Sequence, residues 1–475
     1  MSYKAVDVVL DRYEFPFAFR PEQIRDVNQL AALPRSGWWD EVGTGKTAMS
    51  TAVALYKKIL KPKTVTIIAM PPVLITQWRH WLRSIKGVGE VLAYRGSPKE
   101  RAKLKFDEAE FILVSLPIFK RDYERFCEFF TEDKPVCLII DEATSVKNPG
   151  SGNHKAVRDF VNARNASLLL LTGTPLSTPI DAYAYIKLVT PMLYRNKRHF
   201  ESLHVAERDY FDNVTKWSNL DLLSDNLMCS SSRILKKDAM PDLDEPIYIP
   251  IRYELSSQHA ALYRKLAIEQ FLILENGGRI DASTAPKLYN AVQQIVVNWN
   301  HFSGDPDKKS AGIELVETVL EELGSGKPGG QKLLISSNYK MTNRYLLEHL
   351  KEYNPVAFYS EVSQSKQQQN YRQFIDDPNC WVALVQPLSG GFGLDNFKDV
   401  CWDMLFLECP VIPTHFTQVV GRLYRMGQKF APRVRIGIAE GTIQNRLHNR
   451  LLMTDELVNQ VQGGWKDLKE AIYGN

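Results

Sequence analysis

The stretch DEVGTGKT, Asp40 to Thr47, lies early in the chain, directly after two tryptophans and before a run of helix-forming residues. Its glycines let backbone N–H groups approach a phosphate closely, and Lys46 can neutralise phosphate charge. The Thr47 hydroxyl is suited to Mg²⁺, and the following helix adds the positive end of its dipole. The pattern predicts a phosphate-binding loop made of Gly43, Thr44, Gly45, Lys46 and Thr47.

The match to a phosphate-binding signature is partial, because Asp40 stands where GxxxxGK[ST] has its first glycine. An ordinary glycine-rich turn is the alternative. The run VCLIIDEA favours the phosphate loop, since it ends an apolar segment in the pair Asp141 and Glu142. An aspartate at a strand tip can hold Mg²⁺, and an adjacent glutamate can polarise an attacking water. A lone Asp-Glu pair could instead cap a turn, but the two patterns together predict nucleotide hydrolysis.

The fold class follows from short apolar runs that alternate with helical stretches such as VLITQWRHWLRSI. Unbroken apolar runs of this length are typical of strands buried on both faces of a parallel sheet. The alternation is interrupted by a helix-rich middle and returns after GSGKPGG. We therefore expect α/β architecture with doubly wound parallel sheets. In the first half, the expected strands are 64–70, 111–116, 136–141 and 167–173.

Bulk composition limits the class of protein. The chain has 475 residues, a formal charge of +4 and a pI of about 8.5, which permits a polyanionic partner without requiring one. Its 6 cysteines include no CxxC pair, so we expect reduced thiols and no zinc. We see no signal peptide and no apolar run long enough to span a membrane.

At this point the chain resembles a known family. The blocks FRPEQ, DEVGTGKT, IIAMPPVLITQW, IIDEATSVKN and LLLLTGTPLST resemble superfamily 2 helicases and, more narrowly, Swi/Snf-type DNA translocases. KLLISSNYKMTNRYLLEHL, VQPLSGGFGLDNF and HFTQVVGRLYRMGQ continue the resemblance in the same order. It implies two RecA-like lobes with helical insertions, using ATP and Mg²⁺. The expected parts are an ATP-binding lobe at 1–180, helical protrusions and a link at 181–325, and a second lobe at 326–475.

The resemblance also implies roles for single residues in the first lobe. Gln23 would read the adenine edge, Lys46 would serve the phosphates, Thr47 and Asp141 would hold the metal, and Glu142 would be the base. The TGTP block would couple the nucleotide to the lobe interface through Thr172, Gly173 and Thr174.

In the second lobe, the dense pattern QxxGRxxRxGQ would supply Gln418, Arg422 and Arg425 to catalysis. An arginine at the γ-phosphate stabilises charge in the transition state. The alternative for both arginines is a solvated helix face.

Two departures from the family pattern are visible. Thr144 replaces the histidine that usually follows DEA, and STP follows Leu176 where the family has an asparagine. The first change puts the coupling between hydrolysis and nucleic-acid binding in doubt. Neither change removes a catalytic atom.

A motor of this kind should hold a phosphate backbone through amides and hydroxyls that do not read bases. Candidate contacts lie in MPPVL, VSLPIFK, SSNYK and LSGGFG, and plain strand-to-helix turns are the alternative for each. The tryptophans at 38, 39, 78 and 81 could stack bases, or pack in the core beside the nucleotide. The candidate nucleic-acid contacts are Pro71, Ser115, Ser336, Ser337, Asn338, Ser389, Gly390 and Gly391.

The resulting interpretation is an ATP-dependent translocase on double-stranded DNA. It would hydrolyse ATP between two lobes and move along DNA or remodel protein–DNA complexes. A strand-separating DNA or RNA helicase is one alternative, and a nucleotide-gated scaffold with little turnover is another. A protein partner that targets the chain is possible, and no membrane association is expected. The compact chain suggests a bacterial or phage origin and a cytoplasmic location, or a nuclear one in a eukaryote.

Overall fold

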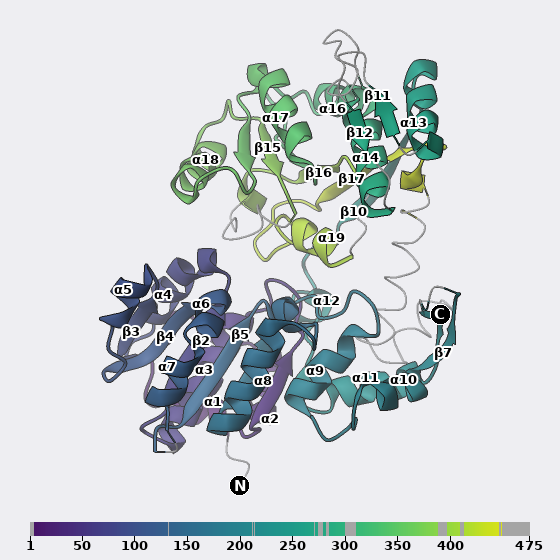
Figure 1. Ribbon diagram of the computed structural model, residues 1–475. Coiled ribbons are helices and arrows are strands. Elements are labelled where there is room, and N and C mark those ends of the chain that lie inside the picture. Colours follow the sequence, from purple (N-terminus) through teal and green to yellow (C-terminus); the bar gives the residue numbers. More distant parts are fainter. Residues whose placement is uncertain are drawn as a thin grey trace. The chain divides into compact units, whose positions relative to one another are not determined.

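The computed structural model describes residues 4–131, 133–210, 212, 214–269, 271–273, 279–281, 285–299, 310–387, 397–408, 413–445 and 448. The chain forms two compact units, and the boundary lies between Ala239 and Met240. Each unit contains a parallel sheet with helices on both faces (Figure 1), which confirms the predicted fold class. The three-part division at residues 180 and 325 stays a prediction.

The first unit is built on a seven-stranded parallel sheet with the strand order β3-β4-β2-β5-β6-β1-β9. The four expected strands form as β2, β4, β5 and β6, with ends within a few residues of those predicted, whereas β1, β3 and β9 were not predicted. The bounds are β1 Arg35–Trp38, β2 Val65–Met70, β3 Glu90–Tyr94, β4 Ala109–Ser115, β5 Val136–Asp141, β6 Ser167–Leu171 and β9 Ser231–Ser232.

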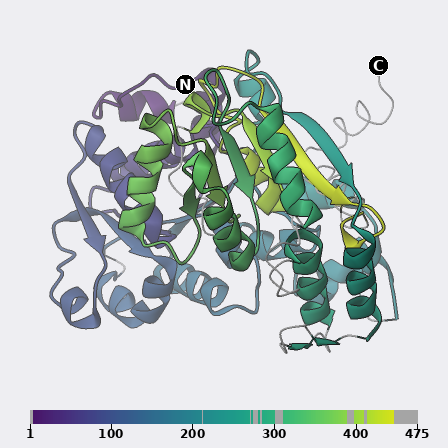
Figure 2. The same cartoon turned by 90° about the horizontal axis from the view of Figure 1, so that it is seen from above.

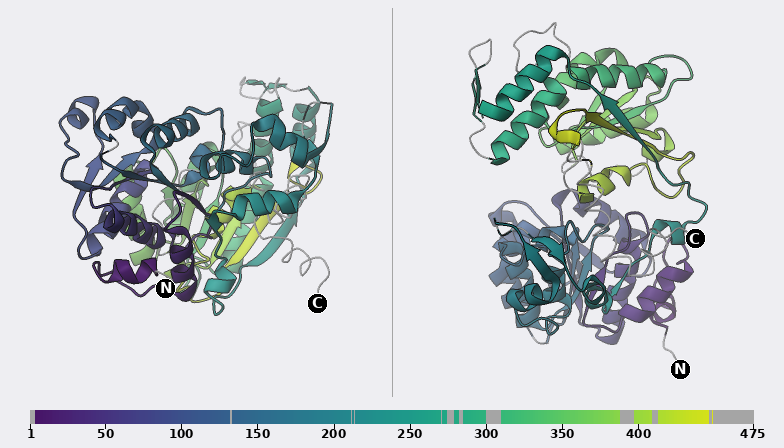
Figure 3. Two further views of the ribbon diagram at one scale, coloured as in Figure 1. Left: turned by 90° about the horizontal axis from the view of Figure 1, so that it is seen from below. Right: turned by 90° about the vertical axis from the view of Figure 1, so that its right-hand side faces the viewer.

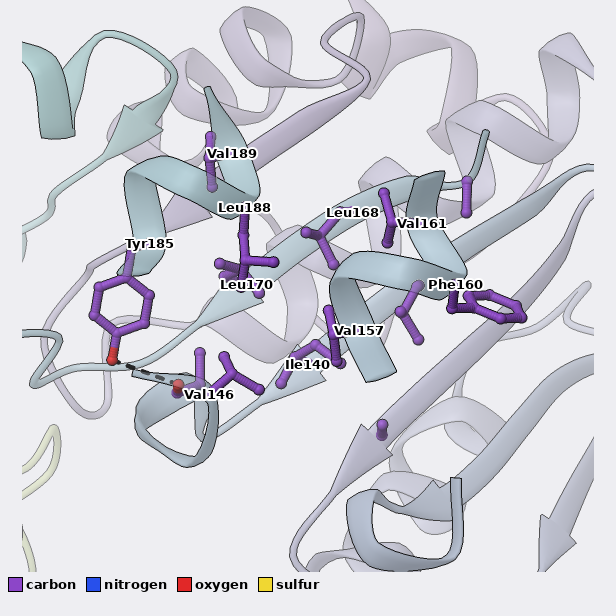
Figure 4. Close-up of a cluster of buried hydrophobic side chains, with 14 of the residues drawn as sticks. Ile140, Val146, Val157, Phe160, Val161, Leu168, Leu170, Tyr185, Leu188 and Val189 are labelled. Carbon is purple, nitrogen blue, oxygen red and sulfur yellow. Dashed lines mark hydrogen bonds between the residues drawn. The ribbon is translucent and has the colours of Figure 1, made fainter. Parts of the chain in front are cut away.

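Strands β2, β5 and β6 of this sheet are mainly apolar because both faces of the sheet are covered. In β5, Leu138 and Ile140 belong to one buried cluster, whereas Cys137 and Ile139 belong to another on the opposite face. This alternation follows from the two-residue period of a strand. Figure 4 shows part of the first cluster, in which Phe160 lies among strand and helix side chains.

Helices cover the two faces of the first sheet. One face packs against α1 Ala5–Leu10, α2 Pro21–Leu30, α3 Lys46–Leu60 and α4 Ile75–Ser84. The other packs against α6 Leu116–Arg121, α7 Tyr123–Phe129, α8 Gly152–Arg164 and α9 Asp181–Val189. The remaining elements are α5 Pro98–Ala102, η1 Pro72–Leu74, η2 Ala143–Val146, α10 Lys197–His204, β7 Val205–Arg208, β8 Val214–Trp217, α11 Leu220–Met228 and α12 Lys236–Ala239.

The second unit has a six-stranded parallel sheet with the order β10-β17-β16-β13-β15-β14. Helices α16 and α17 contribute to the buried cluster on one face, and α18 and α19 to the cluster on the other. The strand bounds are β10 Ile247–Tyr253, β13 Leu333–Ser336, β14 Val356–Phe358, β15 Val382–Val385, β16 Asp403–Phe406 and β17 Arg433–Ala439. The helix bounds are α16 Ala311–Glu322, α17 Lys340–His349, η3 Lys351–Tyr353, α18 Gln364–Asp376, η4 Phe397–Asp399 and α19 Pro413–Val420.

Two further helices of the second unit, α13 Ser257–Glu269 and α14 Ala285–Asn298, lie side by side (Figure 2 and Figure 3). Short strands β11 Phe271–Ile273 and β12 Arg279–Asp281 pair antiparallel between them. Ile295 packs in a separate cluster with Leu266 and Trp299. Val292 lies in the same cluster, so apolar residues of α14 at three- and four-residue steps share one buried face.

The helix-rich middle also contributes strands that the sequence analysis did not predict. Strand β10 pairs in parallel with β17 at the edge of the second sheet. It contains Pro250, which lacks an N–H donor and is tolerated at a sheet edge. Strand β9 has only two residues and pairs with β1 in the first sheet.

A buried ion cluster links β16 and β17. Asp403 is fully buried and accepts hydrogen bonds from Arg433 Nη2 at 2.6 Å and Arg435 Nη1 at 2.5 Å. Arg435 is itself only 7% exposed. The pairing compensates the cost of removing these charges from water. Without Asp403, the buried guanidinium of Arg435 would lose its carboxylate partner.

We therefore expect Asp403→Ala to lower the free energy of unfolding of the second unit by about 3 kcal/mol. The matched control is Glu440→Ala, which removes the exposed partner of Arg252 and should change it by less than about 1 kcal/mol. Urea unfolding of both variants measures the difference. Equal effects would show that the Asp403 cluster adds nothing beyond a surface ion pair.

Candidate functional site

The predicted phosphate loop connects β1 to α3, which begins at Lys46. Gly43 and Gly45 have φ values of 91° and 101°, in the left-handed region that favours glycine. The Gly45 carbonyl oxygen accepts from the backbone N–H groups of Ala48 at 3.0 Å and Met49 at 3.1 Å. The loop thus ends at the start of a long helix, where unpaired N–H groups and the helix dipole favour an anion.

Lys46 lies within this loop. Its ammonium donates to the carbonyl oxygens of Asp40 and Glu41, the latter at 2.9 Å. Burial lowers the pKa of Lys46, and four carboxylates oppose this shift. In decreasing order of effect they are Asp40, Glu142, Asp141 and Glu41. The lysine and the Asp-Glu pair at the end of β5 therefore lie within electrostatic reach of one another.

Gln23 lies against the same loop, at the first turn of α2. Its Oε1 accepts from Arg20 N at 2.9 Å, and its Nε2 donates to the carbonyl oxygen of Thr44 at 2.8 Å. Arg20 Nη2 donates to the same oxygen at 2.7 Å. A Cβ on Gly45 would come within 2.3 Å of Gln23 Nε2, so this approach requires glycine. The adenine-reading role of Gln23 stays a prediction, and Arg20 is a contact that the sequence analysis missed.

Asp141 is the last residue of β5, and both of its oxygens accept hydrogen bonds. Trp78 Nε1, from α4, donates to Oδ2 at 2.7 Å, and the Glu142 backbone N–H donates to Oδ1 at 3.0 Å. Burial raises the pKa of Asp141, and the bond from Trp78 works against that shift. The indole therefore favours the ionised carboxylate, which is the form that binds a cation.

Glu142 has a strained backbone. Its φ of 54° and ψ of 59° lie in the left-handed region, which costs a non-glycine residue about 1 kcal/mol. The turn η2 follows directly and contains Thr144. Tyr185, from α9, donates to the carbonyl oxygen of Ala143 at 3.4 Å (dashed in Figure 4). The buried phenol of Tyr185 therefore helps to hold the turn that follows β5.

The TGTP block packs directly against the phosphate loop. Thr172 N donates to the Trp38 carbonyl oxygen at 3.1 Å and extends the pairing of β6 with β1. Thr174 N donates to Thr172 Oγ1 at 3.2 Å. A Cβ on Gly173 would come within 2.9 Å of Val42 Cγ2 and 3.0 Å of Val42 N. The predicted coupling role of Thr172, Gly173 and Thr174 is untested, but the contact gives it a physical route.

Ser177, the first residue of the STP segment that departs from the family pattern, makes a second set of contacts. Ser177 Oγ accepts from Lys147 Nζ at 2.8 Å, and the Ser177 N–H donates to Asp181 Oδ2 at 2.8 Å. Lys147 also lies 3.6 Å from Asp181. The segment after Asp141–Glu142 is thus tied to the segment after TGTP, by residues that the sequence analysis did not single out.

The second-unit candidates Gln418, Arg422 and Arg425 lie at the end of α19 and in the turn after it. Arg425 Nε donates to the Gly421 carbonyl oxygen at 2.6 Å. All three are partly buried. Their predicted catalytic role stays a prediction.

The candidate nucleic-acid contacts of the first unit follow neighbouring strands. Pro71 comes directly after β2, and Ser115 is the last residue of β4. Met70 and Ser115 are paired in register, so the two candidates lie at the same edge of the sheet. Ser115 is buried, so we expect its backbone rather than its hydroxyl to be the candidate contact.

The candidates of the second unit lie at the end of β13. Ser336 and Ser337 are buried, and Ser337 Oγ donates to Glu408 Oε1 at 2.8 Å. The Asn338 backbone N–H donates to Glu408 Oε2 at 3.0 Å. Burial raises the pKa of Glu408 to about 7. This carboxylate holds the turn and was missed by the sequence analysis. Ser389, Gly390 and Gly391 lie outside the described residues.

The tryptophans are part of the core rather than a base-stacking surface. Trp38, Trp39 and Trp78 are 2% exposed or less. Trp81 is partly buried and donates through Nε1 to Thr51 Oγ1 at 3.0 Å, in the helix that follows the phosphate loop. Within the described ranges, no cluster of histidine, cysteine and acidic side chains forms a metal site of three or more such residues. In the same ranges, no helix has the length and apolar character needed to cross a membrane.

Known proteins resemble this chain over most of its length. The yeast ISWI chromatin-remodeling complex ATPase ISW1 (Saccharomyces cerevisiae) is 25% identical over 481 residues, covering 93% of this chain and 40% of the relative. The chromodomain-helicase-DNA-binding protein 1-like of Danio rerio is 23% identical over 473 residues, covering 93% of this chain and 44% of the relative. The chain thus spans less than half of the length of these relatives.

A solved structure supports the fold. The helicase domain of Pyrococcus furiosus Hef matches with a TM-score of 0.53 at 15% identity, covering 91% of this chain and 98% of that structure. A model of the SNF2-related domain matches residues 37–302, which is more than half of the 475 residues. The sequence blocks, the two parallel sheets and this match agree, and the protein belongs to the SNF2-related family.

Proposed function

We propose that the protein is an ATP-dependent translocase on double-stranded DNA, which hydrolyses ATP to move along the duplex or to remodel protein–DNA complexes. The main observation behind the proposal is the grouping of Lys46, Asp141 and Glu142. They come from two strand ends of one sheet, and the charges of both carboxylates act on the Lys46 ammonium. In open α/β sheets, ligands bind beyond the carboxyl ends of the strands.

The residues fit a magnesium nucleotide. Thr47 and Asp141 offer hydroxyl and carboxylate oxygens, which Mg²⁺ prefers. Each Asp141 oxygen accepts one hydrogen bond and has a second lone pair. When bound, Mg²⁺ would neutralise charge on the β- and γ-phosphates. Lys46 would exchange its carbonyl partners for phosphate oxygens, and Glu142 would accept the proton of the attacking water.

Support for duplex DNA comes from the family and from one relative whose name includes DNA binding. Pro71 and Ser115 lie side by side at the end of β2 and β4, where backbone groups can contact a phosphate strand without reading bases. Contacts of this kind would put the nucleic acid at the same edge of the sheet as the nucleotide loop. A conformational change there would act on both.

The first prediction concerns turnover. Glu142→Gln should retain ATP binding and lose at least about 10²-fold in kcat, because the amide cannot accept the proton. Lys46→Ala should weaken ATP binding about tenfold or more and also slow turnover, because a charged donor to the phosphates is lost. Steady-state hydrolysis and a fluorescent-nucleotide titration separate the two effects.

The control for these variants is Glu124→Gln, an isosteric change at an exposed position of α7. It should leave both measurements unchanged. A Glu142→Gln variant with near-normal kcat would assign the base to another residue.

The second prediction concerns Trp78. Trp78→Phe removes the N–H that donates to Asp141, and losing a hydrogen bond to a metal ligand changes metal affinity or activity by about tenfold or more. We expect the Mg²⁺ concentration for half-maximal ATP hydrolysis to rise about tenfold. Trp81→Phe is the matched control, because it removes an indole on the same helix that donates to Thr51 instead. The same Mg²⁺ dependence for both variants would remove the assigned role of Trp78.

The third prediction concerns the polymer. ATP hydrolysis measured alone, with duplex DNA, with single-stranded DNA and with RNA should be stimulated most by the duplex, and a tailed duplex should stay paired. Stimulation should weaken with added salt, since phosphate contacts release counterions. Unwinding of the tailed duplex would instead indicate a strand-separating helicase. Nucleotide binding with no hydrolysis under any condition would indicate a nucleotide-gated scaffold.

A further inference from the structure

The segment from Ser231 to Lys236 runs alongside the phosphate loop. Strand β9 pairs in parallel with β1, and the ladder continues past both strands. Trp39 N donates to the Ser232 carbonyl oxygen at 3.0 Å, and Glu41 N donates to the Ile234 carbonyl oxygen at 2.9 Å. We call Ser231–Lys236 the exit segment, because the chain leaves the first unit shortly after it. The backbone of the exit segment is thus bonded to the first residues of the phosphate loop.

The side chains of Asp40 and Glu41 in the phosphate loop also bond to the exit segment. Asp40 is fully buried, and its Oδ1 accepts from Ile234 N at 2.8 Å while its Oδ2 accepts from Ser232 Oγ at 3.2 Å. Glu41 Oε2 accepts from Lys236 N at 2.8 Å. Asp40 occupies the position where the general phosphate-loop signature has glycine. At this position the carboxylate satisfies a backbone donor of a segment far along the chain.

The same two loop residues hold the phosphate-binding lysine. The carbonyl oxygens of Asp40 and Glu41 accept from Lys46 Nζ. A phosphate that draws Lys46 away therefore changes the hydrogen bonding of the two residues that hold the exit segment. Three residues further on, at Ala239, the first unit ends. The exit segment is the last part of the first unit before the chain enters the second.

The electrostatics of Asp40 fit a carboxylate that depends on these contacts. The pKa of Asp40 is raised to about 6, mainly by burial and also by the charge of Asp26. The charge of Lys46 and the hydrogen bonds from Ser232 and Ile234 lower it. Lys46 and the exit segment thus both favour the ionised form of Asp40. Moving Lys46 away therefore changes the charge balance at the carboxylate that holds the exit segment.

We propose that Asp40 is a positioning residue that links phosphate occupancy of the loop to the order of the exit segment, Ser231–Lys236. This inference rests on the proposed nucleotide binding and adds a route by which the bound phosphate reaches the chain that leaves the first unit. By reciprocity, an exit segment that is held in place favours nucleotide binding.

Hydrogen–deuterium exchange of the peptide covering 231–239, in the full-length protein with and without a non-hydrolysable ATP analogue, tests the link. In the unmodified protein, exchange should differ at least threefold between the two conditions. Asp40→Ala should abolish this difference and weaken analogue binding about tenfold, as expected for lost hydrogen bonds to a charged group. Asp40→Asn should restore both in part, because its amide oxygen still accepts from Ile234 N but the charge on which Lys46 acts is lost.

Two serines on the exit segment give a matched pair that avoids altering the loop. Ser232→Ala removes the bond to Asp40, whereas Ser231→Ala removes a bond of similar length, 2.9 Å, to the Leu227 carbonyl oxygen. Ser232→Ala should reduce the nucleotide-dependent exchange difference, and Ser231→Ala should leave it intact. This comparison remains decisive even if Asp40→Ala fails to fold.

The outcomes separate the inference from the proposed function. If the unmodified protein binds and hydrolyses ATP, but exchange at 231–239 ignores the analogue, the link is wrong and the proposed function stands. The link is also wrong if Asp40→Ala and Ser232→Ala respond like the unmodified protein. If the unmodified protein binds no nucleotide, the proposed function and the link both fail.

Discussion

The close packing of other segments onto the phosphate loop is the constraint on which the first unit depends. Gln23 presses on Gly45, and the loop of Gly173 presses on Val42, at distances that leave no room for an added Cβ. Glycine is required at 173 because of its neighbour Val42, and at 45 because of its positive φ as well as its neighbour Gln23. A loop that holds phosphates through N–H groups must keep its shape, and here the surrounding elements add to the rigidity that the loop's own side chains supply.

A second theme is that strand ends are held by buried polar groups from elsewhere in the chain. Trp78 bonds to Asp141 in the first unit, and Glu408 bonds to Ser337 and Asn338 in the second. Such groups are expensive to bury unless they are paired. Their positions at the carboxyl ends of parallel strands, where ligands bind in this fold class, make them part of the functional edge rather than of the general core.

Much of the fold was predictable, because the signals are local. The central strands of both sheets are continuous apolar runs, and α3 follows the glycine loop as expected. Strands β9 and β10 were missed for physical reasons. Ser231–Ser232 is too short and polar to show a pattern, and Pro250 argues against a strand unless the strand is known to lie at an edge.

The site was predictable in its residue types but not in its contacts. Spacing and chemistry identify Lys46, Asp141 and Glu142, whereas the partners Trp78 and Tyr185 depend on which helices the sheet order places beside them. No local pattern encodes that order.

The left-handed backbone of Glu142 sets local stability against the proposed chemistry at one position. Asparagine and glycine adopt this conformation more easily than glutamate does, so either residue at position 142 would stabilise the turn by up to about 1 kcal/mol. The position that the proposed function assigns to the base is thus also one where the backbone itself favours a different residue.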